Sequence, residues 1–220
     1  MIFDLRFAIE ILPRLIEGAL LTVLVTVLAF VVAAFGGVVI LMVRRSGTIV
    51  APIVGFLAEF IRSTPLLVQI LFLYLALPQY GIVLDPLEVG VIGIGLHYSC
   101  YLAEVYRAGL EAVPRGQFDA ATALSFGRIE TYRRIVTPQV FQTVFPVLGN
   151  FLIYMYKDSP LLSVIAFAEL MFIANEIGTA TFRYLEPVTL AGVLFLVMGA
   201  ATASLLRFAE VRIGRRWVRG

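Results

Sequence analysis

The stretch GALLTVLVTVLAFVVAAFGGVVILMV, residues 18–43, decides the fold class of this chain. Its 26 residues carry no charge, and about 20 apolar residues are enough to cross the hydrocarbon core of a membrane. Two further uncharged runs, Ser63–Leu84 and Pro187–Leu206, contain 22 and 20 residues. Each of these runs therefore predicts one transmembrane helix.

Two shorter runs, Val89–Ala103 and Val140–Tyr156, become spans if Glu104 and the Lys157–Asp158 pair lie at membrane depth. The whole chain is 60% hydrophobic, and its mean hydropathy is +0.96. Globular domains contain only about 45–50% apolar residues. We expect an all-α membrane protein that forms one domain over residues 1–220, with about five transmembrane helices near 16–43, 53–79, 88–112, 139–168 and 187–208. The first span follows acidic residues and is too long for a signal peptide, so we expect it to be retained.

The arginines predict how the spans are oriented, because basic residues gather on the cytoplasmic side of a membrane. Three arginines flank the spans on the side predicted to be outside: Arg6, Arg14 and Arg183. Twelve follow the first, third and fifth spans: Arg44, Arg45, Arg107, Arg115, Arg128, Arg133, Arg134, Arg207, Arg212, Arg215, Arg216 and Arg219. We expect the N-terminus outside and the C-terminus in the cytoplasm. Orientation and contact with lipid headgroups explain these arginines, so a nucleic-acid partner is not expected.

The same rule places residues 113–138 in the cytoplasm as the largest soluble segment. Pro114 precedes an expected helix over Gly116–Leu124, and Ser125–Gly127 is typical of a turn. Gly127 is expected to cap a second helix that carries Ile129, Tyr132 and Val136 on one face. Such a helix can lie on headgroups or dock in the groove of a partner, and its periodicity does not separate the two.

Polar residues form stripes along three predicted spans. The third span carries His97, Tyr101 and Glu104 at helical spacing, and the fourth carries Asn150, Tyr154 and Lys157. On the second span, Glu59, Arg62 and Gln69 lie near one face, although Pro65 is expected to kink this helix. Such stripes can hold helices together or line a cavity. The candidate path residues are Gln69, His97, Tyr101, Asn150, Tyr154, Lys157, Asp158 and Ser159. Glu59, Arg62, Glu104 and Arg107 are candidates for interhelical ion pairs or a gate.

Several kinds of site are missing from the sequence. It contains no P-loop pattern, and Lys157 is its only lysine. His97 is the only histidine, and no zinc-ligand spacing or nucleophile–base set is present. We therefore expect neither an enzyme nor a metal site, and no cofactor bound to this chain.

Four motifs resemble those of one transporter family. DAATALSFGRIETYRRIVTP (119–138) is similar to the EAA loop of ABC importer permeases, with Asp119 in place of Glu and Ser125 in place of Gly. Gly127, two residues later, is expected to supply the missing flexibility. FIRSTPLLVQILFLYLALP (60–78), YLAEVYRAGLEAVPRGQFDAA (101–121) and KDSPLLSVIAFAEL (157–170) resemble further segments of polar amino acid permeases, with Pro160 replacing a usual Ser.

This resemblance implies a type I ABC importer permease in the bacterial cytoplasmic (inner) membrane. Two such subunits, identical or paralogous, would sit on two cytoplasmic ATPases that bind ATP and Mg²⁺, and an extracytoplasmic binding protein would deliver a polar amino acid or a related zwitterion such as ectoine. Residues 113–138 would be the coupling segment that docks on the ATPase. Its implied contact residues are Phe118, Asp119, Ala120, Ala121, Ser125, Gly127, Ile129, Tyr132, Ile135 and Pro138.

Two other functions are compatible with parts of the pattern. A lone ion-coupled carrier or channel would use Glu104, Asp158 and His97 as a proton relay. It would need no cytoplasmic docking segment and would function without an ATPase. A membrane-anchored scaffold or sensor would explain the docking segment but not three polar stripes.

Overall fold

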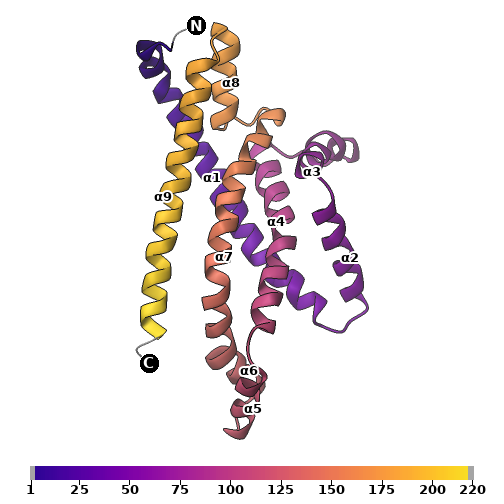
Figure 1. Cartoon of the computed structure of the whole chain (residues 1–220). Coiled ribbons are helices and arrows are strands. Elements are labelled where there is room, and N and C mark those ends of the chain that lie inside the picture. Colours follow the sequence, from indigo (N-terminus) through magenta and orange to yellow (C-terminus); the bar gives the residue numbers. More distant parts are fainter. Residues whose placement is uncertain (1–2, 218–220) are drawn as a thin grey trace.

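The computed structural model describes residues 3–217, with side chains placed for residues 3–212. The side chains of Arg215, Arg216 and Arg219, which contribute to the predicted orientation, lie outside that part. The described chain is helical throughout and contains no strand (Figure 1). Its main elements are α1 (Leu5–Arg44), α2 (Val50–Ser63), α3 (Leu66–Leu71), α4 (Pro86–Glu111), α5 (Arg115–Ala123), α6 (Arg128–Thr131), α7 (Thr137–Asp158), α8 (Leu170–Thr181) and α9 (Leu185–Trp217).

The long helix α1 packs along α4 at the centre of the bundle. It starts 11 residues before the predicted span, because Asp4 caps it by accepting the backbone N–H groups of Arg6 and Phe7. Small residues allow the two helices to approach closely: a Cβ added at Gly37 would lie 3.0 Å from the Leu102 Cβ. The buried positions along this seam place the main apolar core between α1 and α4.

The second predicted span, 53–79, is not one straight helix. The helix breaks at Thr64–Pro65. At this break the chain bends by 107° between Val50–Ser63 and Leu66–Tyr80. The expected kink at Pro65 is therefore present but is much sharper than a bend in a continuous helix. Gln69 Nε2 donates to the carbonyls of Ile61 (2.7 Å) and Thr64 (3.2 Å), and Tyr101 Oη donates to the carbonyl of Arg62 (3.3 Å). These side chains satisfy the backbone groups that the break exposes.

Three helical segments are long and apolar enough to cross a membrane: α1, Arg128–Ile165 and Leu185–Arg212. The bent pair makes a fourth if it counts as one span. The polar stripe on α4 lowers the hydropathy of the third predicted span. With 26 residues, about 39 Å at 1.5 Å per residue, α4 is still long enough to cross. The five-span count stays a prediction that depends on this central helix.

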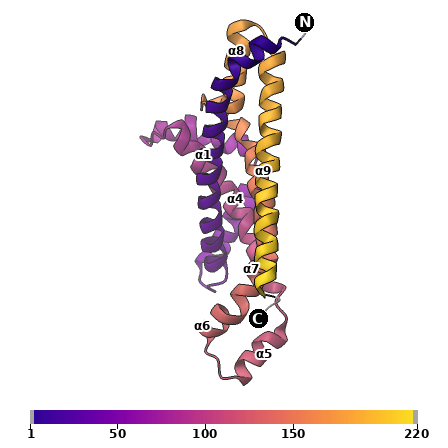
Figure 2. The same ribbon diagram turned by 90° about the vertical axis from the view of Figure 1, so that its left-hand side faces the viewer.

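The N-terminus and α8 lie at one end of the bundle, whereas α5, α6 and the end of α9 lie at the other (Figures 1 and 2). The helix α8 lies between the ends of α7 and α9 in the sequence, and one face of it is buried. Leu170, Ala174 and Ile177 pack against α1 and α9. The assignment of the α5–α6 end to the cytoplasm remains a prediction from the distribution of arginines.

Glu169 caps α8 from a fully buried position. Its carboxylate accepts the backbone N–H groups of Met171 (2.8 Å) and Phe172 (2.7 Å). Burial raises the pKa of Glu169 to about 7 despite these two hydrogen bonds, because removal from water penalises the charged form.

This buried carboxyl makes stability depend on pH. An acid with a raised folded-state pKa contributes its stability below the unfolded pKa of about 4.3 and loses it as the pH rises towards 7. We expect the melting temperature of the purified protein to fall between pH 5 and pH 8, and Glu169→Gln to flatten this dependence while keeping the cap. An equally steep pH dependence in the variant would show that another group is responsible.

Candidate coupling segment and polar interior

The coupling segment forms a compact unit that extends beyond the end of the bundle (Figures 1 and 2). It contains α5, α6 and the π-turn η3 (Tyr132–Val136), which continues directly into α7. The two predicted helices are both present, with starts within a residue of expectation. The second does not end before the membrane but runs on as the fourth span.

The turn between the helices explains where a glycine would be favourable. Phe126 N–H donates to the Ala121 carbonyl and Ser125 N–H to the Thr122 carbonyl, both at 2.9 Å. This pair of bonds is a Schellman motif, whose C′ residue is usually a left-handed glycine. Here C′ is Ser125, with φ +60°. Gly127 is extended at the N-cap of α6, with φ −66° and ψ 159°, so Ser125 and not Gly127 takes the left-handed position of this turn, and the flexibility expected of Gly127 stays a prediction.

Several predicted contact residues stabilise the segment itself. Ala121 and Val136 are fully buried. Phe118 and Tyr132 are half-buried and meet in an edge-to-face pair with ring centroids 6.3 Å apart. The helical face that periodicity assigned to a partner is thus partly the internal face of the segment. Val136 in particular is not available for docking.

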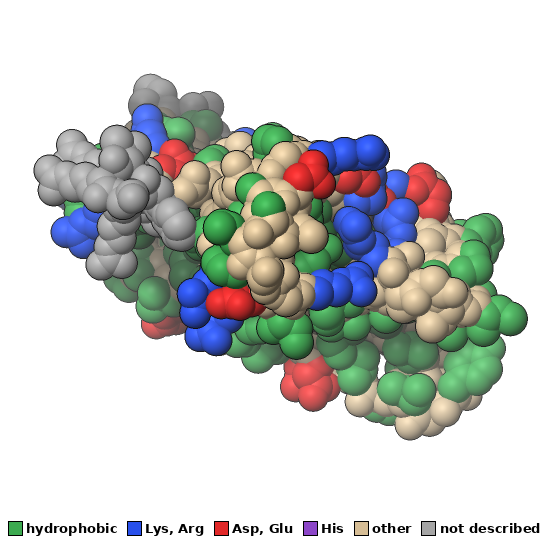
Figure 3. Space-filling view, turned by 90° about the horizontal axis from the view of Figure 1, so that it is seen from below, with side chains coloured by type: hydrophobic (Ala, Val, Ile, Leu, Met, Phe, Trp, Pro, Cys, Tyr) green, Lys and Arg blue, Asp and Glu red, His purple; other side chains and the backbone are tan. Residues whose placement is uncertain are grey.

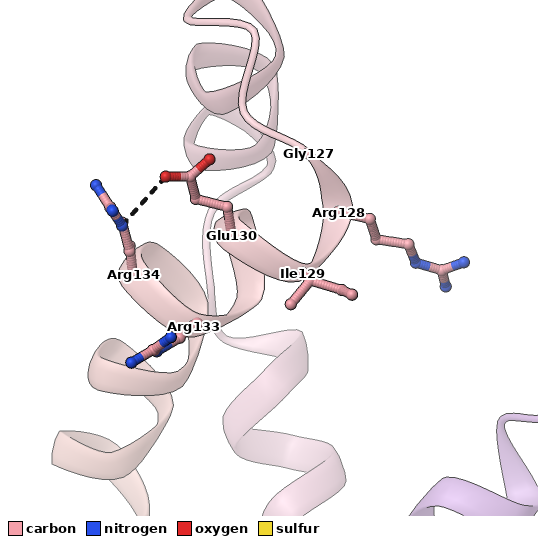
Figure 4. Close-up of a pocket in the computed structure, with 6 residues that line it drawn as sticks. All are labelled: Gly127, Arg128, Ile129, Glu130, Arg133 and Arg134. Carbon is pink, nitrogen blue, oxygen red and sulfur yellow. Dashed lines mark ion pairs between the residues drawn. The ribbon is translucent and has the colours of Figure 1, made fainter.

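The exposed apolar residues of the segment are Ile129 (84% exposed) and Leu124 (67%). Sequence reasoning missed Leu124 because it sits at the C-cap of α5, where helical periodicity ends. Ile129 and Arg128 point away from the body of the segment, whereas Glu130 pairs with Arg134 at 3.2 Å (Figure 4). Of the remaining predicted residues, Ile135 and Pro138 are half-buried, and these are exposed: Asp119, Ala120, Ser125 and Gly127.

Viewed from below, the molecule shows basic and acidic side chains on either side of a central area of backbone, polar and apolar atoms (Figure 3). Arg115, Arg128 and Arg133 are exposed and form no ion pair within residues 3–212. The exposed end of the segment therefore combines apolar groups with a net positive charge.

A cluster of ion pairs joins three helices just above the coupling segment. Glu104 on α4 pairs with Arg107 at 2.7 Å, with Arg62 of α2 at 3.8 Å and with Arg44 of α1. The four residues proposed as ion pairs or a gate come together here, since Arg62 also pairs with Glu59. The cluster extends further than the sequence indicated, and its additional members are Arg44 and Glu111.

Part of the predicted path also comes together in the interior. His97 Nδ1 lies 3.2 Å from Gln69 Oε1, and the His97 and Tyr101 rings lie 5.2 Å apart. Tyr98, which the stripe pattern missed, donates a hydrogen bond from its hydroxyl to Asp158. Ser159 is buried and donates to the Tyr156 carbonyl at 2.9 Å.

The other path candidates lie outside this interior cluster. Asn150, Tyr154 and Lys157 are exposed along α7. Within the described residues there is no ion pair between Lys157 and Asp158, and no group of three or more possible metal ligands.

The sequence matches a protein-family model over residues 29–215, and that family is described as the inner membrane component of binding-protein-dependent transport systems. This chain belongs to that family. A probable amino-acid ABC transporter permease, y4tG of Sinorhizobium fredii, is 39% identical over 98% of this chain and 94% of its own length. The glutamine transport system permease GlnP of Escherichia coli is 33% identical over 96% and 98%, and the arginine permease ArtQ of Bacillus subtilis is 31% identical over 89% and 90%.

Solved structures agree with this assignment. An amino acid ABC transporter with histidines has a chain that is 34% identical, with a TM-score of 0.90 over 96% of this chain and all of that one. The MetNI methionine transporter, at 18% identity and a TM-score of 0.74 over 94% and 97%, shares the fold. The chain is thus an inner-membrane permease subunit of an ABC transporter.

The left-handed Ser125 gives a local prediction. A left-handed conformation costs a residue with a Cβ about 1–2 kcal/mol, and glycine avoids that cost. We expect Ser125→Gly to slow amide hydrogen exchange in residues 115–126, and Ser125→Val to accelerate it several-fold, because a β-branched residue tolerates this conformation poorly. Faster exchange in Ser125→Gly would contradict the assigned turn.

Proposed function

We propose that this chain is the permease subunit of an importer that moves a polar amino acid into the cytoplasm. Two permease subunits would form the path, two ATPases would bind ATP and Mg²⁺, and an extracytoplasmic binding protein would deliver the substrate. The amino-acid transport named for relatives that match nearly the whole chain supports the substrate class. The comparisons give no support to ectoine as the substrate or to a lone secondary carrier.

The coupling segment carries this proposal. A helix that lies on lipid headgroups has to run in the plane of the membrane surface. Here α5 and α6 extend past the α1–α2 loop and the end of α9 (Figure 2), with Ile129 and Leu124 exposed. That position favours a protein groove in which these two side chains are buried while the unpaired arginines contact acidic groups at its rim.

The connections of the segment allow it to move the membrane helices. α5 follows α4 after only three residues, and η3 is continuous with α7. A displacement of the docked segment is therefore transmitted to the two helices that carry the Tyr98–Asp158 hydrogen bond. Rigid-body movement of this kind is a known way to alternate a path between its two faces. The Glu104 ion-pair cluster would make α1 and α2 follow α4.

A substitution at the exposed side chain of Ile129 on α6 tests the docking. We expect Ile129→Asp to lower ATP-driven amino-acid uptake in proteoliposomes by more than about tenfold, because a charge replaces an apolar anchor of the interface. Co-purification of the ATPase should weaken in parallel, and membrane insertion should stay normal because Ile129 contacts little of its own chain.

Ile49→Asp is the matched control. Ile49 lies in the α1–α2 loop at the same end of the bundle and is 86% exposed, against 84% for Ile129. The Ile49→Asp variant should retain amino-acid uptake and ATPase binding. Wild-type uptake in Ile129→Asp, or an equal loss in both variants, would refute docking through this surface.

A further inference from the structure

The first part of α1, residues 5–20, has one buried face and two exposed faces. On the buried face, Ile11, Leu15 and Ala19 pack against α8 and α9 in a second apolar core. The two exposed faces differ in chemistry, and each continues over several turns of the helix. Their positions relative to α8 and α9 show what surrounds this end of the bundle.

One exposed face consists of large apolar side chains. These are Leu5, Ile9, Ile16 and Leu20, and all four are exposed. Because successive residues of an α-helix are about 100° apart, the four side chains lie within a sector of about 60°. We refer to them as the outer apolar strip.

The other exposed face consists of charged side chains: Arg6, Glu10, Arg14 and Glu17. They occupy a sector of about 80° beside the outer apolar strip, and we refer to them as the charged row. Arg14 pairs with Glu176 of α8 at 3.1 Å, so the charged row lies on the α8 side of α1. It contains two residues of each sign and therefore has no net charge.

The charged row ends where α1 enters its uncharged run. Beyond Gly18, the same sector of the helix carries Leu24, Leu28 and Val32, which are all exposed. Charged side chains are costly in the hydrocarbon core of a membrane, whereas leucine and valine are favourable there. The change from apolar to charged residues therefore places the edge of the hydrocarbon core near Glu17 on the α8 side of α1.

The outer apolar strip borders the opposite edge of the buried face. Gly18, near the edge beside the charged row, lies against α8, because a Cβ added there would be 2.9 Å from the Leu170 Cα. The other edge, beside the strip, is therefore the one that packs against α9. The start of α1 is level with the start of α9, since the Asp4 backbone N–H donates to Glu186 at 3.0 Å (Figure 2).

The surface of α9 beside the strip is also apolar. α9 has no charge from Pro187 to Leu206, and it exposes Val188, Val193 and Leu196. The apolar surface of the bundle thus extends along α9 to the level at which α1 begins. On this side, no charged residue separates the strip from the lipid-facing part of the bundle.

These two faces fit lipid better than a protein partner. The apolar centre of a protein interface is surrounded by a polar rim, but the strip continues into the apolar surface of α9. The charged row contains both signs, and zwitterionic phospholipid headgroups likewise carry a phosphate and an amine. A helix with one apolar side and one charged side is typical of the membrane interface.

We propose that residues 5–20 of α1 form an interfacial helix that binds the phospholipid surface at the α8 end of the bundle. The outer apolar strip contacts acyl chains beside α9. The charged row lies among zwitterionic headgroups and water on the α8 side. This contact holds α1 and, through the second apolar core, α8 and the start of α9 at one depth in the membrane.

Spin labels at neighbouring positions test this proposal. In a Cys100→Ser background, which removes the only native cysteine, single cysteines replace Ile9, Glu10, Ile16 or Glu17. The labelled permease–ATPase complex is reconstituted in bilayers of phosphatidylethanolamine and phosphatidylcholine without a binding protein. Collision of each label with oxygen, which concentrates among acyl chains, is compared with collision with a water-soluble nickel chelate.

We expect the oxygen-to-nickel ratio to be several-fold higher at Ile9 and Ile16 than at their neighbours Glu10 and Glu17. Each pair differs by one residue, so depth along the helix is nearly constant within it. Val31→Cys is the reference for acyl chains, because Val31 is exposed in the uncharged run of α1. A ratio at Ile9 and Ile16 close to that at Val31 would agree with the proposal.

Three contrary results would overturn it. Equal nickel collision within each pair would place the strip in water. A high oxygen ratio at Glu10 and Glu17 as well would place the whole helix in the hydrocarbon core. Low collision with both reagents at Ile9 and Ile16 would show that protein covers the strip, which would make it a contact with another subunit of the complex.

Discussion

Polar groups cannot be left without partners inside a membrane, and this constraint accounts for the least regular part of the structure. Pro65 interrupts the second span, and beside this break the carbonyls of Ile61, Arg62 and Thr64 accept side-chain hydrogen bonds. The side chains of Gln69 and Tyr101 donate to those carbonyls, which makes a 107° break tolerable within the bundle. Gln69 also contacts His97. Residues that sequence analysis assigned to a path therefore also support the backbone.

The same constraint separates the charged residues into two kinds. Glu104 is surrounded by arginines from α1, α2 and α4, and Asp158 is hydrogen-bonded to Tyr98, so both have partners within this subunit. Lys157 has none among the described residues. A charge with a partner can be structural, whereas an unpaired one at membrane depth needs water, substrate or another subunit.

Much of the fold follows from the sequence because uncharged length and helical period are local properties. They predicted the first span, the kink at Pro65 and both helices of the coupling segment. They could not predict the angle of the break, which depends on distant donors such as Tyr101. The turn over Ser125–Gly127 and the N-cap at Gly127 were predicted, but the left-handed conformation of Ser125 was not, because it follows from the end of α5 and not from residue type. Val136 was expected to face a partner, but it is buried within this chain. The periodicity of a helix does not show whether the residues that bury its apolar face belong to the same chain.

Lys157 and Asp158 are adjacent in the sequence but form no ion pair among the described residues. Neighbouring residues on a helix point about 100° apart, so the two charges face different elements instead of one shared site. Leu124 was missed for a related reason, since it lies beyond the last periodic turn of α5 and becomes prominent only when the segment projects from the bundle. The resemblance of four motifs, by contrast, identified the family that the comparisons confirm.

The central claim is that energy reaches this chain from an ATPase through residues 113–138. The most direct test is transport in proteoliposomes that contain the permease with or without its ATPase, supplied with the binding protein, a labelled amino acid and a defined ion gradient. The account predicts uptake only when both the ATPase and ATP are present, and none from the gradient alone. Gradient-driven uptake by the permease without an ATPase would contradict it.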